Sequence, residues 1–231
     1  MGHMIEKTAL ERGHEVVCII EPSAVSGQPS ESKIYSPEEG FTSEAFKSAN
    51  VAIEFTTPAT AEANIRKAWA AGVPVVCGTT GWEMPKNWKG LGYGDYRVRY
   101  DSETNMPVLW DSNFSIGVLV FNVLNYDLRD LLLEYPQYKP SIKEIHHIHK
   151  LDKPSGTAKH LAEHLGENIP IESVREGEVP GTHIVTWDSP DDTIIVTHIA
   201  KGRGGFALGA VIAAEKLAET FKGWLENNGY K

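Results

Sequence analysis

The sequence of 231 residues has little cysteine and lacks any long apolar run. A helix that spans a membrane needs roughly 20 consecutive apolar residues, and no segment supplies them. The chain also starts without the charged and apolar regions of a secretory signal, so we expect a cytoplasmic protein. Both cysteines, Cys18 and Cys77, lie in apolar runs, which indicates small buried thiols rather than a disulfide or a nucleophile.

Positive charge is also scarce. The chain has 22 basic and 31 acidic residues, so its formal net charge is −9. The electrostatic field of a chain with this negative charge repels nucleic acids and anionic membranes, so we expect neither as a partner. An anionic ligand must instead be captured locally, by a helix N-terminus or by a few well-placed lysines or arginines. The hydrophobic content of 41% predicts a folded globular chain, which is long enough for one large or two smaller domains.

A strand is missing where a dinucleotide-binding fold needs one. Residues 4–12 read as a helix that stops at Gly13, and only Met1 and Gly2 could be the tail of a glycine-rich turn that receives a pyrophosphate. We therefore expect that upstream residues are absent from this sequence. The alternative is that residues 2–4 are a remnant of cloning.

The rest of the first half alternates apolar runs with helical stretches. Residues 15–20 predict a strand that ends at Glu21, and a loop rich in serine and proline follows. A second strand is expected at 51–55 and a third at 73–77, joined by a helix that Thr57 would cap. Strand, helix and strand at this spacing indicate a parallel sheet, and therefore an α/β fold.

The second half has a different character. Residues 112–132 are apolar with a helical period, and 141–147 read as extended. Strands at 182–187 and 193–200, joined by a short polar turn, predict an antiparallel hairpin within an α+β domain. The last helix, about 208–227, has one apolar face and is expected to pack back onto the first domain.

Residues 144–158, with the sequence EIHHIHKLDKPSGTA, form the densest polar cluster of the chain. His146 or His147 could exchange a proton near neutral pH, and Lys150 adds a positive charge. A helix start at Ser155 would offer hydroxyl and N–H groups to a carboxylate or phosphate. Alternatively, Ser155 merely caps a helix and the histidines lie on a solvated loop.

A metal site is the other alternative for these histidines, because adjacent imidazoles can bind zinc. No cysteine or carboxylate stands at a suitable spacing, however. His160 and His164 are four residues apart, but Leu161 occupies the position where the zinc protease motif requires glutamate. We therefore expect no metal.

The segment 144–158 closely matches the pattern E-x-H-H-x-x-K-x-D-x-P-S-G-T-A, and by it the sequence resembles the dihydrodipicolinate reductase family, also called 4-hydroxy-tetrahydrodipicolinate reductase. Further similar motifs follow in the family's order along nearly the whole chain: EFTTP at 54–58, GTTG at 78–81, NFSIG at 113–117 and GA at 209–210. The resemblance implies an NAD(P)H-dependent enzyme of lysine and diaminopimelate synthesis.

The resemblance also implies an architecture. A Rossmann-type, parallel-sheet nucleotide-binding domain would comprise residues 1–112 and 207–231. An α+β domain with a mixed sheet, 113–206, would bind the small dicarboxylate substrate and build a homotetramer.

By motif position, the resemblance gives His146 the role of catalytic acid/base and Lys150 that of proton donor. It implies that the substrate carboxylates contact His147, Lys150, Ser155, Gly156 and Thr157. Three departures from the family pattern are Lys153, Trp82 and the pair Asp111-Ser112, and none of them removes a catalytic candidate.

The cofactor site is expected after the buried strand at 73–77, because ligands of open α/β sheets bind at the carboxyl ends of strands. A glycine turn that only reverses the chain is the alternative. Glu21 ends an earlier strand, where an acidic residue bonds the ribose hydroxyls and disfavours a 2′-phosphate, which leans towards NADH over NADPH. The full set of expected contacts is Met1, Glu21, Phe55, Gly78, Thr79, Thr80, Asp111, Ser112, Asn113 and Phe114.

Two rival functions stay open at this stage. A dehydrogenase of amino acids or homoserine could share the architecture, but it would not need the histidine pair with Lys150. A non-catalytic sensor of nucleotides could lack the glycine-rich loop. The basic turn at 201–205 could touch substrate or another subunit, or be a plain surface hairpin.

Overall fold

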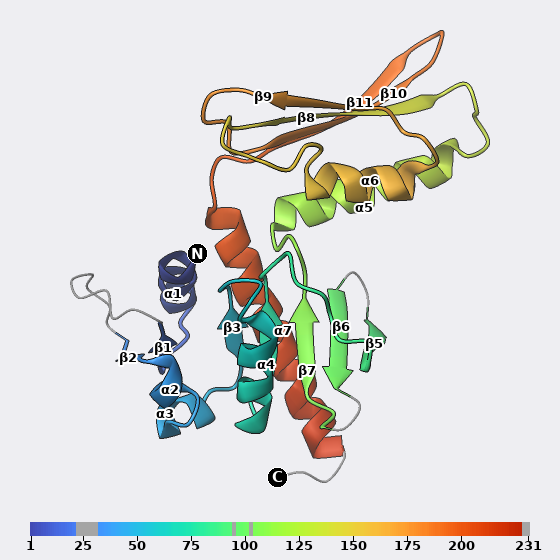
Figure 1. The fold of residues 1–231 in the computed structure, drawn as a ribbon. Coiled ribbons are helices and arrows are strands. Elements are labelled where there is room, and N and C mark those ends of the chain that lie inside the picture. The colour runs from blue at the N-terminus through green and yellow to red at the C-terminus, as the bar shows by residue number, and fades with distance from the viewer. Residues whose placement is uncertain (22–31, 94–95, 102–103, 228–231) are drawn as a thin grey trace. The chain divides into compact units, whose positions relative to one another are not determined.

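The computed structural model describes residues 1–21, 32–93, 96–101 and 104–227 (Figure 1). These residues form two compact units. The first unit comprises Met1–Phe114 and Ala207–Lys231, and the second comprises Ser115–Phe206. The sequence placed the divisions after residue 112 and after residue 206. Each unit has its own sheet and core, and each is described by itself.

The first unit is built on a five-stranded sheet in the order β3-β4-β7-β6-β5. Strands β3, β4 and β7 are parallel, whereas β6 and β5 continue the sheet antiparallel. This parallel-rich sheet confirms the predicted α/β class. The strand bounds are Ala52–Glu54 for β3, Val75–Cys77 for β4, Trp88–Tyr93 for β5, Tyr96–Asp101 for β6 and Pro107–Trp110 for β7.

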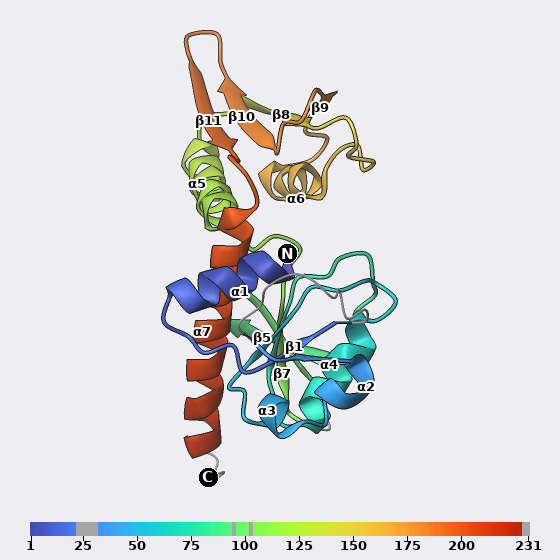
Figure 2. The same cartoon turned by 90° about the vertical axis from the view of Figure 1, so that its left-hand side faces the viewer.

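Helices cover both faces of this sheet, which explains why its central strands are apolar throughout. Val75 and Cys77 of β4 join one core cluster with residues of α4 (Ala61–Ala70). Val76 points to the opposite face, into a cluster formed with α1 (Gly2–Glu11) and α7 (Gly204–Asn227). Figure 2 shows α1 lying across α7. The prediction that the last helix packs onto the first domain is confirmed.

The stretch before β3 departs most from the predicted elements. The strand expected at 15–20 is only Ile19–Ile20 (β1), and it pairs with Ile34–Tyr35 (β2) in a separate parallel ladder. Two short helices follow, α2 (Pro37–Gly40) and α3 (Glu44–Lys47). Residues 22–31 of the expected loop lie outside the described residues. The predicted cap at Thr57 is also wrong: its carbonyl closes a turn, and α4 starts later, with Thr60 as its N-cap.

The second unit is a mixed four-stranded sheet with two helices. Its order is β11-β10-β8-β9, with β8 and β9 parallel and the other pairs antiparallel. The expected hairpin is β10 and β11, and it is confirmed. The elements are α5 (Ile116–Leu132), β8 (Lys139–His146), α6 (Gly156–Leu165), β9 (Ile171–Arg175), β10 (Thr182–Asp188) and β11 (Thr193–Ile199).

Both helices of the second unit lie on the same face of its sheet (Figure 1). Side chains alternate across a strand, so this face collects every second residue. Ile142 of β8 and Val185 of β10 pack there against Phe121 of α5 and Leu161 of α6. In the described part of the chain, no helix is long and apolar enough to cross a membrane.

Candidate active site

The candidate active site surrounds the turn between β8 and α6. The alternation that buries Ile142 also turns Glu144 and His146 to the helix-covered face at the end of β8. Ser155 is the N-cap of α6, and its Oγ accepts a hydrogen bond from the N–H of Ala158 at 3.3 Å. The N–H of Ser155 donates to Glu144 Oε1 at 3.3 Å, so the two ends of the turn are tied together.

Glu144 is completely buried, with 0% of its surface exposed. Its Oε1 accepts a hydrogen bond from Arg175 Nη1 at 3.0 Å, and its Oε2 contacts His146 Nδ1. Burial acts to raise the pKa of Glu144, but hydrogen bonding and the positive charge of Arg175 outweigh it, so the pKa is lowered. Glu144 is therefore a carboxylate at neutral pH.

Two histidines stand next to this carboxylate. The rings of His146 and His183 meet edge to face, 5.1 Å apart, and His183 Nε2 lies 3.3 Å from Ser155 Oγ. Burial lowers the pKa of His183 to about 4, aided by the charge of His146. Burial also lowers the pKa of His146, although Glu144 opposes this. Both imidazoles are thus neutral at pH 7, and His146 is ready to accept a proton.

Lys150 is held at the edge of the same site. Its Nζ lies 2.7 Å from Asp152 Oδ1, and about a quarter of its side chain is exposed. Burial acts to raise the pKa of Asp152, but the hydrogen bond and charge of Lys150 lower it. The backbone carbonyls of both residues accept hydrogen bonds from the Arg175 guanidinium. The Lys150 ammonium and its counter-ion are therefore fixed in place with one side open to water.

The substrate residues expected from the sequence lie around these groups. His147 directly follows β8, Ser155 caps α6, and Gly156 and Thr157 form its first turn. The N-terminal turn of a helix presents N–H groups and a partial positive charge, which suit a carboxylate.

Two residues of the site could not be found from the sequence. Arg175 stands opposite His146 across the β8–β9 ladder, and His183 stands opposite Glu144 across the β8–β10 ladder. The positions of Arg175 and His183 beside the site depend on the register between strands that are distant in sequence. Neither residue lies in a recognisable local motif. Only knowledge of the sheet order could have revealed them.

The geometry also bears on metal binding. Glu144, His146 and His183 offer donor atoms within 4.8 Å of one another, but the Arg175 guanidinium already occupies Glu144 and repels a cation. A second group on α6 consists of His160, Glu163 and His164. The expectation that the enzyme needs no metal stays a prediction.

The expected nicotinamide contacts of the first unit cluster at one edge of its sheet. Phe55 follows β3, Gly78 follows β4 and Asp111 follows β7, which are neighbouring parallel strands. A Cβ at Gly78 would lie 2.1 Å from the Phe55 ring, so glycine at this position lets the ring lie against the backbone. The Phe55 and Phe114 rings are 5.9 Å apart, and the N–H of Asn113 donates to Asp111 Oδ1 at 2.9 Å.

The other expected cofactor contacts have different surroundings. Thr79 is buried, its hydroxyl donates to Glu54, and its carbonyl accepts from two tryptophan side chains, whereas Thr80 and Ser112 are exposed. Met1 is the N-cap of α1 and makes no side-chain cap bond there. Glu21 follows β1, outside the five-stranded sheet, and its N–H donates to the carbonyl of Tyr35.

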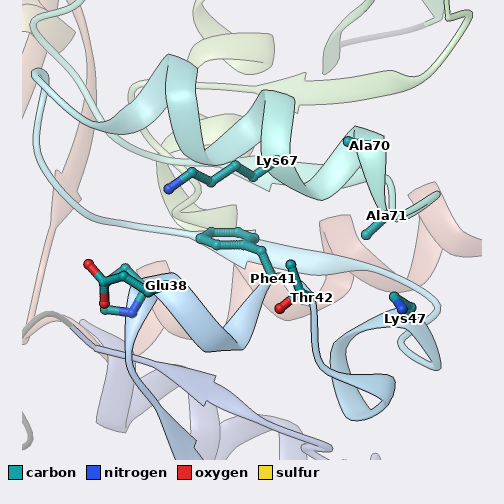
Figure 3. Close-up of a pocket in the computed structure, with 8 residues that line it drawn as sticks. Glu38, Phe41, Thr42, Lys47, Lys67, Ala70 and Ala71 are labelled. Carbon is teal, nitrogen blue, oxygen red and sulfur yellow. The ribbon is translucent and has the colours of Figure 1, made fainter.

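A pocket of about 330 Å³ lies elsewhere in the first unit, between α2, α3 and α4 (Figure 3). Lys67 extends over the Phe41 ring, with its Nζ 5.4 Å from the ring centroid. Glu38 and Lys47 lie at the rim of the pocket. Ala70 and Ala71 of its wall lead into the amino end of β4, at the opposite edge of the sheet from Gly78. None of the expected site residues lines this pocket.

Comparison with known proteins identifies relatives over both units. The N-terminal family model of dihydrodipicolinate reductase matches residues 1–89, and the C-terminal model matches 117–228. The 4-hydroxy-tetrahydrodipicolinate reductase of Christiangramia forsetii is 36% identical over 95% of this chain and 89% of its own. That of Bdellovibrio bacteriovorus is 32% identical over 90% of this chain and 86% of its own.

Solved structures share the fold. The dipicolinate-bound dihydrodipicolinate reductase from Paenisporosarcina sp. TG-14 superimposes with a TM-score of 0.68 at 19% identity, covering 94% of this chain and 90% of that one. An aspartate semialdehyde dehydrogenase II from Vibrio cholerae gives a TM-score of 0.55 at 12% identity, covering 94% and 93%. By its sequence relatives and both family models, the chain belongs to the dihydrodipicolinate reductase family.

Proposed function

We propose that this chain reduces 4-hydroxy-tetrahydrodipicolinate to tetrahydrodipicolinate with NADH or NADPH, in lysine and diaminopimelate biosynthesis. The observation that carries the proposal is the folded 144–158 segment, which joins a neutral histidine, a held lysine and an anion-binding helix start. Curated relatives over 95% and 90% of the chain have the same named activity.

The substrate binds to the second unit. One carboxylate accepts hydrogen bonds from the Ser155 hydroxyl and from the N–H groups of Gly156 and Thr157, where the helix dipole favours negative charge. His147 and Lys150 contribute to the same binding. A dipicolinate-bound member of the same fold supports a small dicarboxylate as the ligand class.

Lys150 and His146 carry out the proton transfer that accompanies reduction. The 4-hydroxyl of the substrate leaves as water, and reduction at C4 then leaves an enamine that must be protonated at the neighbouring carbon. An ammonium held by Asp152 is a suitable donor for this proton. The neutral His146 accepts and returns protons next to it. Both residues thus act as general acid or base rather than as nucleophiles.

The cofactor binds to the first unit. Phe55, Gly78, Thr79, Thr80 and the 111–114 segment hold the nicotinamide at the carboxyl ends of the parallel strands. The start of α1 at Met1 faces the pyrophosphate, and Glu21 bonds the adenine ribose and favours NADH. When bound, the reduced cofactor supplies the hydride.

We also propose a homotetramer in the cytoplasm. The sheet face of the second unit that is turned away from its helices carries Ile195 and Ile199, which are 60% and 65% exposed. Ile184 of β10 and Ile145 of β8 lie on the same face. Thr182, Thr186 and Lys143 lie between these isoleucines on the same face. A sheet face with exposed apolar side chains of this kind is suited to subunit contacts.

The test is the loss of reduced-nicotinamide absorbance when the enzyme meets substrate made from pyruvate and aspartate semialdehyde by the preceding synthase. Turnover should fall at least about a thousandfold in Lys150→Ala, because the proton donor is lost, while cofactor binding persists. Lys47→Ala also removes a lysine that is paired with a carboxylate, that of Glu44, but outside the site, and it is the matched control. Wild-type protein that binds cofactor but consumes none would refute the proposal.

A further inference from the structure

We infer that Glu144 and Arg175 are positioning residues, which hold His146 and Lys150 in their reactive places without touching the substrate. The inference rests on the proposed function. It assigns one linked network, in which the Glu144 carboxylate joins the end of β8 to the start of α6 and Arg175 joins that carboxylate to the turn between them.

The turn needs such an anchor because apolar packing does not supply one. Ile148 and Leu151 are 60% and 96% exposed, so the hydrophobic side chains of the turn are not buried within the unit. Its backbone is held instead by the segment that follows β9. The N–H of Ile148 donates to the carbonyl of Gly177 at 3.1 Å, and His149 Nε2 lies 3.3 Å from the exposed Glu178 carboxylate.

Arg175 makes the central contacts to this turn. Its Nε donates to the carbonyl of Lys150 at 3.2 Å, and its Nη2 donates to the carbonyl of Asp152 at 2.5 Å. The two bonded carbonyls flank Leu151 and belong to the ion pair that carries the proton donor. A planar guanidinium can make several such bonds at once, whereas an ammonium is a single point charge.

Glu144 fixes Arg175 and His146 together. Its two oxygens take different partners, Oε1 facing Arg175 and Oε2 facing His146 Nδ1. Contact at Nδ1 orients the imidazole and leaves Nε2 as the atom that can exchange a proton with a ligand. A Cβ at Gly181 would lie 3.1 Å from His146 Nε2, so the absence of a side chain there keeps space beside the reactive nitrogen.

The two charged side chains at the centre of the network are also shielded from solvent. Glu144 is fully buried, and the exposed fraction of the Arg175 side chain is only 13%. A buried carboxylate without its cation would be costly, so both residues are needed together. Sequence position alone does not assign Arg175, since its partners are set by the β8–β9 register.

The first test is Arg175→Lys, which keeps a positive charge for Glu144 but cannot bond both carbonyls. We expect kcat to fall at least about tenfold and the affinity for dipicolinate, measured by calorimetry, to weaken several-fold, while the KM for NADH stays within about twofold. The matched control is Arg129→Lys, since Arg129 also donates to a backbone carbonyl, that of His164, but outside the site. A folded Arg175→Lys enzyme with wild-type kcat and dipicolinate affinity overturns the role of Arg175.

The second test follows the His146 imidazole by NMR in Glu144→Gln. Lys150, Arg175 and the His183 ring also face this imidazole, and the charges of Lys150 and Arg175 disfavour its protonated form. Removing the opposing Glu144 charge should therefore move the His146 titration to lower pH and lower kcat. An unchanged titration and unchanged kcat would overturn the role of Glu144.

A double variant distinguishes a folding defect from a loss of function. If Glu144→Gln unfolds because Arg175 is left unpaired, the double variant Glu144→Gln/Arg175→Met removes both charges, and kcat should still fall at least about tenfold. If the wild type reduces no substrate, the proposed function fails. The His146 titration still decides the role of Glu144 in that case, without any turnover.

Discussion

Gly209 allows α7 to lie directly against the chain segment that follows β7, and replacing Gly209 should strongly destabilise the fold. A Cβ at this position would lie 1.6 Å from the carbonyl oxygen of Phe114, and the obstacle is backbone rather than a flexible side chain. Helix and segment would have to separate by more than about 1 Å. Overpacking of this kind costs about 3 kcal/mol, which lowers the unfolding midpoint of a chain of this size by roughly 10 °C.

The same helix provides a matched control for this substitution. Among the described residues, no atom lies within 4 Å of a Cβ built at Gly223. Gly223→Ala should therefore raise the midpoint by about 2 °C, because alanine is the better helix former. Thermal unfolding followed by circular dichroism compares the two variants. Because Phe114 is an expected nicotinamide contact, Gly209→Ala should also raise the KM for NADH. Equal midpoints for the two variants would refute the packing argument.

Three further predictions concern single side chains. Ser155→Ala removes the acceptor for the Ala158 N–H, so it should cost about 1 kcal/mol of unfolding free energy and raise the KM for substrate in steady-state assays. Glu215, whose pKa is lowered to about 2 by hydrogen bonding to Arg12, contributes stability above pH 4.5 that is lost as the pH falls towards 2. Glu215→Gln should thus cost about 1 kcal/mol at pH 7, and urea unfolding should show that cost vanish near pH 2. Glu21→Ala should lower the KM for NADPH relative to NADH, and an unchanged ratio would contradict the ribose contact.

Local patterns were sufficient for the elements that are regular and contiguous. The β10–β11 hairpin follows from alternation on both sides of a polar turn, and the buried run at β4 predicted a parallel strand. The hairpin of β5 and β6 escaped prediction because glycines and charged residues interrupt its apolar pattern. Within the described residues, the strand at β1 is short because its ladder with β2 comprises Ile19 and Ile20 alone.

The site was predictable to the extent that it is local in sequence. His146, Lys150 and Ser155 lie within one motif, and the structure places them around a single turn. Arg175 and His183 reach the same turn only through the register of β9 and β10, which no short-range pattern encodes. The pKa shifts of the histidines follow from burial, which also depends on this register.

The most direct test of the account uses NADH that carries deuterium at both C4 positions and measures transfer of deuterium to the product. If the chain reduces 4-hydroxy-tetrahydrodipicolinate as proposed, mass spectrometry should find the product one mass unit heavier than with ordinary NADH. The label should appear at the same rate as the loss of cofactor absorbance, and both should disappear in Lys150→Ala. Oxidation of cofactor without any deuterium in the product would contradict the account.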